Sequence, residues 1–85
     1  MKTFTYVITD PEGIHARPAG LLIKKAGTFP CSITLKKGEK SADAKRIFAV
    51  MGLAAKKGEE LTVTCDGERE EEAARELEVF LQENL

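Results

Sequence analysis

The sequence predicts an α+β fold in which a four-stranded sheet is covered on one face by helices. Three segments alternate apolar with polar residues, which is the period of a half-buried strand, and a fourth short segment follows a tight turn. Three other segments repeat their apolar residues every three or four positions, which is the period of a helix with one buried face. Turn residues separate these segments, so the predicted order is strand, helix, strand, strand, helix, strand, helix.

The first half of the chain supplies two strands and one helix. The first strand is expected over Thr3–Thr9, where threonines alternate with apolar residues: Phe4, Tyr6 and Ile8. The segment Asp10–Gly13 has the composition of a turn. A helix is expected from Ala16 to about Gly27, because the apolar residues there follow the helical spacing: Ala19, Leu22, Ile23 and Ala26. The second strand is expected over Cys31–Lys36.

The second half of the chain supplies the remaining elements. A short third strand is expected over Lys40–Asp43, after the turn Lys37–Glu39. The next apolar residues indicate a short helix: Ile47, Phe48, Val50, Met51, Leu53 and Ala54. In the segment Leu61–Cys65, apolar residues alternate with threonines, which predicts the fourth strand. Glutamates then begin a last helix, where they suit the positive end of the helix dipole, and its buried stripe is Ala73, Ala74, Leu77, Phe80 and Leu81.

Length and charge limit the kind of function. The 85 residues indicate a single domain, 1–85, which is too small to enclose a large active site, so the chemistry is expected on the surface. Residues 1–65 carry a net positive charge and residues 66–85 a net negative one, although the whole chain has a net charge of -1. A basic face indicates an acidic partner or a phosphate group. Nucleic acid is not expected, because no basic run is interleaved with aromatic residues.

The two cysteines and the absence of targeting signals indicate the compartment. The N-terminus has no apolar signal sequence, and the longest apolar stretch, Ile47–Ala55, is interrupted by Gly52 and far too short to span a bilayer. A cytoplasmic location with free thiols is therefore expected. Cys31, Cys65 and His15 have no spacing that is typical of a metal site, so we expect core packing for the cysteines and neither a metal nor a cofactor.

One stretch combines residue types that carry chemistry: Gly13–Ala19 contains His15, which is the only histidine, followed by Arg17 and Pro18. His15 lies just before the first predicted helix, where backbone N–H groups without partners make an anion site. Pro18 has no N–H group, so the free donors there are those of Ala16 and Arg17. The Arg17 guanidinium adds a charge whose donors match phosphate oxygens. Although a lone histidine near a turn is often a plain surface residue, this one is positioned as a nucleophile beside a phosphate cradle.

The stretch Gly13–Ala19 resembles the active-site signature of the HPr family of histidine-containing phosphocarriers, and Lys45–Leu53 resembles that family's second marked segment. The spacing between them, the length and the element order also match. The resemblance implies an open-faced β-sandwich with an antiparallel sheet of strand order 1-4-2-3. It implies that His15 accepts a phosphoryl group from enzyme I through Nδ1 and passes it to a sugar-specific enzyme IIA, as a relay protein without independent turnover. In that strand order, Cys31 and Cys65 should lie near each other on the helix-covered side.

The chain departs from the family at one position. Family members that a serine kinase regulates carry serine where this chain has Arg46, so the resemblance does not bring that regulatory site with it. Two other functions on the same fold stay open. One is a regulatory adapter that binds a partner without transferring phosphate, and the other is a phosphocarrier of the parallel, nitrogen-linked branch. The retention of His15 with Arg17 favours phosphoryl transfer over the adapter.

A carrier must present an apolar centre to its partners, and several residues are candidates for this surface. Leu21 and Phe48 are expected to dock partners, whereas Ile47 and Met51 fit either docking or core packing. Basic residues are expected to form a rim that accelerates association: Lys24, Lys40, Lys45 and Arg46. The expected partners are enzyme I and enzyme IIA, and the carrier itself is expected to be a monomer.

Overall fold

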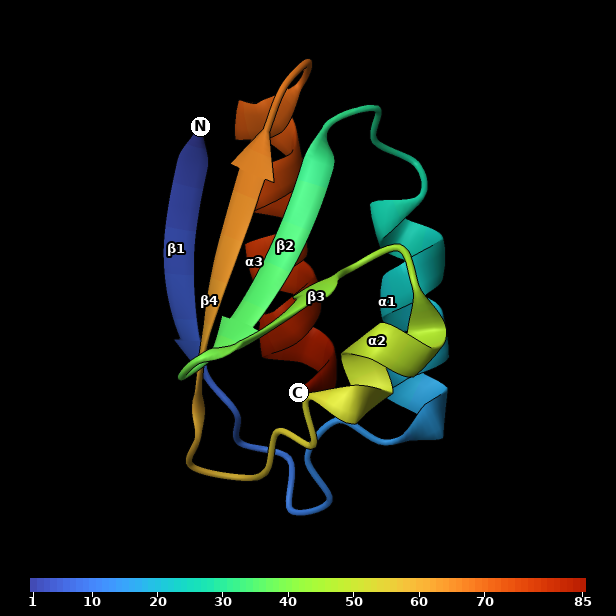
Figure 1. Cartoon of the computed structure of the whole chain (residues 1–85), viewed down its shortest axis with the longest axis vertical. Coiled ribbons are helices and arrows are strands. Elements are labelled where there is room, and N and C mark those ends of the chain that lie inside the picture. Colours follow the sequence, from blue (N-terminus) through green and yellow to red (C-terminus); the bar gives the residue numbers. More distant parts are fainter.

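The computed structural model describes all 85 residues and contains one antiparallel four-stranded sheet with the strand order β1-β4-β2-β3 (Figure 1). This confirms the predicted fold class. The elements are, in chain order, β1 (Lys2–Val7), α1 (Ala16–Ala26), β2 (Ser32–Lys37), β3 (Lys40–Asp43), α2 (Ile47–Gly52), β4 (Glu60–Asp66) and α3 (Glu70–Asn84).

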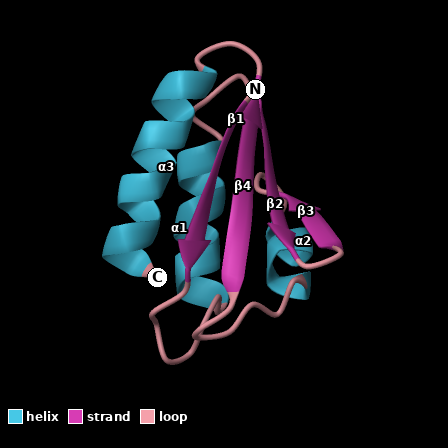
Figure 2. Ribbon diagram, turned by 90° about the vertical axis from the view of Figure 1, so that its left-hand side faces the viewer, coloured by secondary structure: helices cyan, strands magenta, loops and turns pink.

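The molecule has two layers, with α1 and α3 side by side on one face of the sheet and α2 next to α1 and β3 (Figure 2). The alternation in the strands explains which face the helices cover. Val63 in β4 lies opposite Phe4 in β1, and both belong to the helix side, whereas Thr62 lies opposite Thr5 on the open side. The open face is therefore polar, as expected for an antiparallel sheet with one solvated face. No helix in the structure has the length and apolar character that a membrane span requires.

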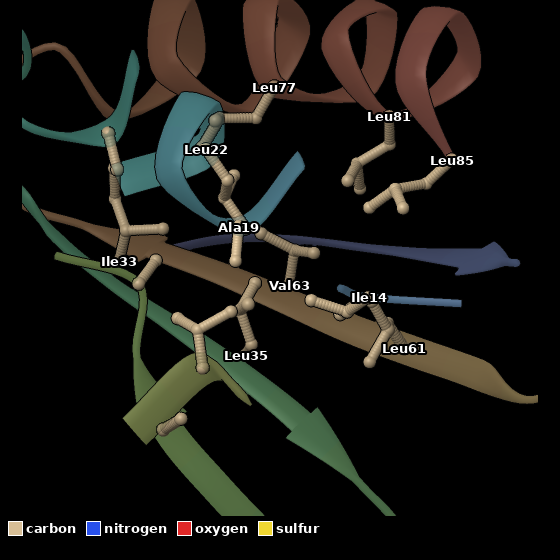
Figure 3. Close-up of a cluster of buried hydrophobic side chains, with 14 of the residues drawn as sticks. Ile14, Ala19, Leu22, Ile33, Leu35, Leu61, Val63, Leu77, Leu81 and Leu85 are labelled. Atoms are coloured by element: carbon tan, nitrogen blue, oxygen red, sulfur yellow. The ribbon is translucent and has the colours of Figure 1, made fainter. Parts of the chain in front are cut away.

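The core lies between the sheet and the helices and forms one cluster of 21 buried hydrophobic residues. Leu22 of α1 and Leu77 of α3 meet Ile33 of β2 and Val63 of β4 in this cluster (Figure 3). Burying a side chain of this size stabilises the fold by about 1.5–3 kcal/mol. No polar or charged residue is buried with them. The functional chemistry therefore has to lie at the surface, as the length of the chain predicts.

Two element ends differ from the sequence prediction by two residues, and the other predicted boundaries differ by at most one. The first strand ends at Val7 and not at Thr9, because the Thr9 N–H group leaves the sheet and donates a hydrogen bond to the Leu85 carbonyl oxygen at 2.6 Å. The short helix ends at Gly52 and not at Ala54, which has a left-handed backbone with φ +50°. In α3, Ala74 and Phe80 are only partly buried, while the other residues of the predicted stripe are in the core.

The two cysteines lie as predicted. Cys65 pairs with Ile33 across the strands, and Cys31 precedes Ile33 by two residues on the same face. Both side chains are buried on the helix-covered side, and both thiols are free. Burial raises the pKa of the Cys65 thiol to about 11, and the neighbouring Cys31 adds to this effect.

Cys65 is expected to be unreactive in the folded protein. With a pKa of about 11, only about one thiol in ten thousand is ionised at neutral pH, and the thiolate is the nucleophilic form. Iodoacetamide should therefore leave native Cys65 unmodified over hours and alkylate it rapidly in urea, as followed by intact mass and peptide mapping. Rapid alkylation of Cys65 in the folded state would contradict its burial.

Candidate functional site

His15 occupies the N-cap position of α1, with an extended backbone at φ -110° and ψ -179°. Its side chain is 37% exposed, so the imidazole is partly buried but accessible to solvent. The loop after β1, the start of α1 and the end of α3 come together at this end of the molecule (Figure 1). The structure therefore places His15 where the sequence predicts it, at a surface formed by three elements.

The loop before His15 is fixed by its own hydrogen bonds and by one buried side chain. The Glu12 N–H group donates to Asp10 Oδ1 at 2.8 Å, and the Gly13 N–H group donates to the Asp10 carbonyl oxygen at 2.9 Å. Ile14 is buried in the core, and its N–H group donates to the Ala55 carbonyl oxygen at 3.0 Å. The position of His15 is therefore set on both sides, by α1 and by this turn.

The first turn of α1 presents two backbone donors without partners. The Ala19 N–H group is the first that donates within the helix, to the His15 carbonyl oxygen at 3.0 Å. Pro18 has no N–H group, and those of Ala16 and Arg17 donate no hydrogen bond within the chain. Free donors at the positive end of a helix make an anion site, so this turn can bind phosphoryl oxygens.

Arg17 and His15 line the same surface depression, which has a volume of about 250 Å³. The depression is completed by Asp10, Pro18, Leu21 and Asn84. Arg17 is exposed and forms no ion pair with an acidic residue of the chain, so its guanidinium is free to bind an anion. No group of three or more His, Cys, Asp or Glu side chains is placed to hold a metal ion.

Two carboxylates also face His15, and the sequence prediction missed both of them. Asp10 Oδ2 lies 4.0 Å from His15 Nε2, and Glu12 Oε2 lies 3.6 Å from the same nitrogen. The prediction treated Asp10 and Glu12 only as turn residues. The spacing of Glu12 and His15, three residues apart, was a signal that they could meet. Asn84 also went unnoticed, because it reaches the depression from the far end of the chain.

The apolar docking candidates are mostly exposed. Phe48 is 87% exposed on α2, and Leu21 on α1 and Met51 on α2 are exposed as well. Ile47 is half-buried and packs against the core. A large aromatic side chain that is so exposed contributes little to the packing of the core, and its docking role stays a prediction.

The basic candidates fall into two groups. Lys24, Lys40 and Arg46 are exposed. Arg46 occupies the N-cap position of α2 without a side-chain capping hydrogen bond, and its guanidinium Nε lies 3.9 Å from Asp43 Oδ2. The ammonium of Lys45, by contrast, donates hydrogen bonds to the carbonyl oxygens of Phe29 at 2.7 Å and Cys31 at 2.8 Å. Lys45 therefore joins the start of α2 to the loop before β2, and its charge is less available to a partner than those of Lys24 and Arg46.

Comparison with known sequences agrees with this geometry. The sequence model of the family described as the PTS HPr component phosphorylation site matches residues 2–83. The phosphocarrier protein HPr of Lysinibacillus sphaericus is 45% identical over 83 residues, which cover 98% of this chain and 94% of that protein. The phosphocarrier protein HPr of Mycoplasma capricolum is 40% identical over 77 residues, which cover 91% of this chain and 86% of that protein.

Solved structures show the same fold. A crystal structure of HPr from Thermoanaerobacter tengcongensis matches with a TM-score of 0.94 and 33% identity, over 99% of this chain and 94% of that one. A structure described as an HPr dimer from the same organism matches with a TM-score of 0.78 and 34% identity, over 98% and 95% of the two chains. The expectation of a monomer therefore stays a prediction. The family match spans nearly the whole chain and includes the turn and helix that present His15, so the chain belongs to the HPr family of phosphocarriers of the phosphotransferase system.

Proposed function

We propose that His15 accepts a phosphoryl group from phospho-enzyme I and passes it to a sugar-specific enzyme IIA. One observation carries this proposal: the only histidine of the chain is accessible at a helix start whose N–H groups have no partner, beside an arginine without an ion pair. An imidazole is a nucleophile, and the features around it bind the product of its phosphorylation. Such a protein relays the phosphoryl group and has no turnover of its own.

Each residue of the site has a distinct part in this proposal. His15 Nδ1 forms the bond to phosphorus. The Ala16 and Arg17 N–H groups and the Arg17 guanidinium stabilise the negative charge that phosphorylation adds. They have no such charge to stabilise in the free protein. Pro18 is a buried residue of this turn and fixes its backbone without removing a needed donor. The stabilisation is therefore greatest in the state that the carrier has to keep until it meets its acceptor.

The direct test is incubation with phosphoenolpyruvate and enzyme I, followed by measurement of the intact mass. The expected result is a gain of one phosphoryl group that is lost in acid and survives in base, which is the behaviour of a phosphohistidine. Omitting enzyme I is the control and should give no gain. An acid-stable phosphoryl group would indicate a hydroxyl acceptor and would reject His15 as the site.

The exposed apolar side chains on α1 and α2 are proposed as the docking surface for both partners. Phe48, Leu21 and Met51 supply its apolar part, and half-buried Ile47 lies at its base. Lys24, Arg46 and Arg17 supply positive charge, with Lys45 fixing the loop that leads into α2. An apolar centre with a charged rim is the common organisation of a transient interface, in which the rim mainly sets the association rate.

Arg46→Glu is expected to slow phosphoryl transfer from enzyme I by roughly two- to fivefold at low salt, and less at high salt. Arg46 is 80% exposed, and its one acidic neighbour, Asp43, lies at 3.9 Å, so reversing its charge changes the field that a partner meets. A cation at a helix start does not stabilise the helix, which leaves association as its role. The measurement is the transfer rate across an ionic-strength series.

Two further variants make the Arg46 result specific. Arg46→Ser removes the charge without reversing it and should have a smaller effect. Arg75→Glu makes the same reversal on exposed α3 and should leave the rate near that of the parent. Equal rates for Arg46→Glu and the parent at low salt would mean that Arg46 is only a solvated surface residue.

The proposal also covers the compartment and the oligomeric state of the carrier. Its partners hand on the phosphoryl group in the cytoplasm, and the free, buried thiols of Cys31 and Cys65 suit a reducing compartment. We propose the monomer as the working form, because a carrier has to expose the same surface to two partners in turn. Arginine at position 46 offers no hydroxyl to a serine kinase, so control at this position is not expected.

A further inference from the structure

The Asp10 carboxylate is held in one orientation by its own turn. Its Oδ1 accepts a hydrogen bond from the Glu12 N–H group at 2.8 Å, and its backbone N–H donates to the Leu85 carbonyl oxygen at 2.8 Å. The side chain is only 28% exposed, so solvent screens it less than a free surface carboxylate. Because Oδ1 is engaged, the second oxygen, Oδ2, is the one that faces the imidazole.

Both carboxylates near His15 approach the same ring nitrogen. Nε2 lies 4.0 Å from Asp10 Oδ2 and 3.6 Å from Glu12 Oε2. The His15 side chain makes no capping hydrogen bond to α1, so no N–H group of the helix occupies the lone pair of Nδ1. The two ring nitrogens point in divergent directions, so both carboxylates lie on the Nε2 side of the ring.

We propose that Asp10, assisted by Glu12, is a positioning residue that keeps a proton on His15 Nε2 and so leaves the lone pair on Nδ1. A neutral imidazole carries one proton, and the partner of one nitrogen decides which nitrogen holds it. Two negative groups beside Nε2 favour the form with a proton at Nε2. The use of that lone pair for phosphoryl transfer rests on the proposed function, whereas the position of the proton does not.

The proton on Nε2 has a part in both directions of transfer. When Nδ1 attacks, its lone pair forms the new N–P bond, and the bond between phosphorus and the donor breaks with its electron pair staying on the donor. The Nε2 proton does not move, so the ring becomes a phosphoimidazolium whose positive charge faces Asp10 and Glu12. When the phosphoryl group leaves for an acceptor, the N–P electron pair returns to Nδ1 and a neutral imidazole is left. The carboxylates thus favour the nucleophile on the way in and the leaving group on the way out.

The sharpest variant is Asp10→Asn, which removes the charge with almost no change of shape. The amide oxygen can still accept the Glu12 hydrogen bond, so the turn is retained, and the NH₂ group then replaces the oxygen that faces Nε2. That group donates, so it favours a ring with a bare Nε2 and a proton on Nδ1. Glu12→Gln tests the more exposed partner, whose side chain is 75% exposed, and should have a smaller effect.

The matched control is Asp43→Asn. Asp43 has the same local arrangement before α2, because its Oδ1 accepts the Lys45 N–H group at 2.9 Å, but it has no contact with His15. The measurement is the ¹⁵N shifts and ring couplings of His15 at alkaline pH, which report the proton position directly. The parent and Asp43→Asn should hold the proton mainly on Nε2, and Asp10→Asn should shift the ratio toward Nδ1 by roughly fivefold, the order expected for one partly exposed charge.

The phosphorylated forms give a second measurement. In the Asp10→Asn variant, the phosphoryl group on His15 should be hydrolysed and transferred more slowly than in the parent, because the Nε2 proton is held less firmly. A parent protein with the proton mainly on Nδ1, or an unchanged ratio in Asp10→Asn, would overturn the proposal. If Asp10→Asn did not fold, the parent spectrum and Glu12→Gln would decide it. A chain that enzyme I cannot phosphorylate would reject the proposed function and leave the proton position still measurable.

Discussion

Replacing His15 with alanine is expected to abolish phosphorylation by enzyme I completely while leaving the fold intact. The chain has no second histidine that could accept the group. The imidazole contributes little to stability, because it is partly exposed and makes no capping hydrogen bond to α1. His15→Ala should therefore change the free energy of unfolding by less than about 1 kcal/mol. Intact mass after incubation with enzyme I and phosphoenolpyruvate measures the first effect, and urea unfolding measures the second.

The matched control for His15→Ala is Ser41→Ala, which removes an exposed hydroxyl on β3 and should be phosphorylated like the parent. A retained gain of one phosphoryl group in His15→Ala would place the acceptor elsewhere. A large loss of stability in His15→Ala would mean that the side chain is part of the packing, and the missing phosphorylation would then say little about the site.

The fold could be predicted from the sequence because the alternation within the strands reports burial directly. Leu61, Val63 and Cys65 alternate with threonines in the sequence, and in the structure all three are buried in the core while the threonines between them lie on the open face. Boundaries depend on contacts between distant residues, which periodicity does not contain. Thr9 continues the alternation of the first strand, yet its N–H group and hydroxyl both donate to Leu85, at the other end of the chain.

For the site too, the features that depend on local contacts could be predicted from the sequence, and those that depend on distant contacts could not. His15 and Arg17 could be predicted because a helix start and the residues beside it are local features. The orientation of the Asp10 carboxylate could not, since it depends on a turn that is tied to Leu85. Lys45 shows the limit most clearly: its sequence context is that of an exposed rim residue, but its ammonium binds the carbonyl oxygens of Phe29 and Cys31, which precede it by 16 and 14 residues.

Gly13 lies in the loop before His15, where its backbone passes close to Ala55 and Lys56. Its backbone is left-handed, with φ +66°, a conformation that costs a residue with a Cβ atom about 1–2 kcal/mol. A Cβ atom there would also collide with the Ala55 carbonyl oxygen and lie 2.9 Å from Lys56 Cα. Both obstacles are backbone atoms, which cannot rotate away as a side chain can. The same carbonyl oxygen accepts the Ile14 hydrogen bond, so relieving the collision would break the contact that anchors the loop.

Gly13→Ala is therefore expected to destabilise the protein by about 3 kcal/mol or more, from the left-handed backbone and the collision together. Gly38→Ala separates the two causes, because Gly38 has a similar φ of +58° with no atom within 4 Å of the added Cβ. It should cost only about 1–2 kcal/mol, from the backbone alone. Urea unfolding of the parent and both variants measures the difference, which corresponds to a lower Tm by roughly 4–8 °C for each kcal/mol in a domain of this size. Equal losses for the two variants would show that the loop before His15 can move away from Ala55, and that the fold does not fix the position of His15.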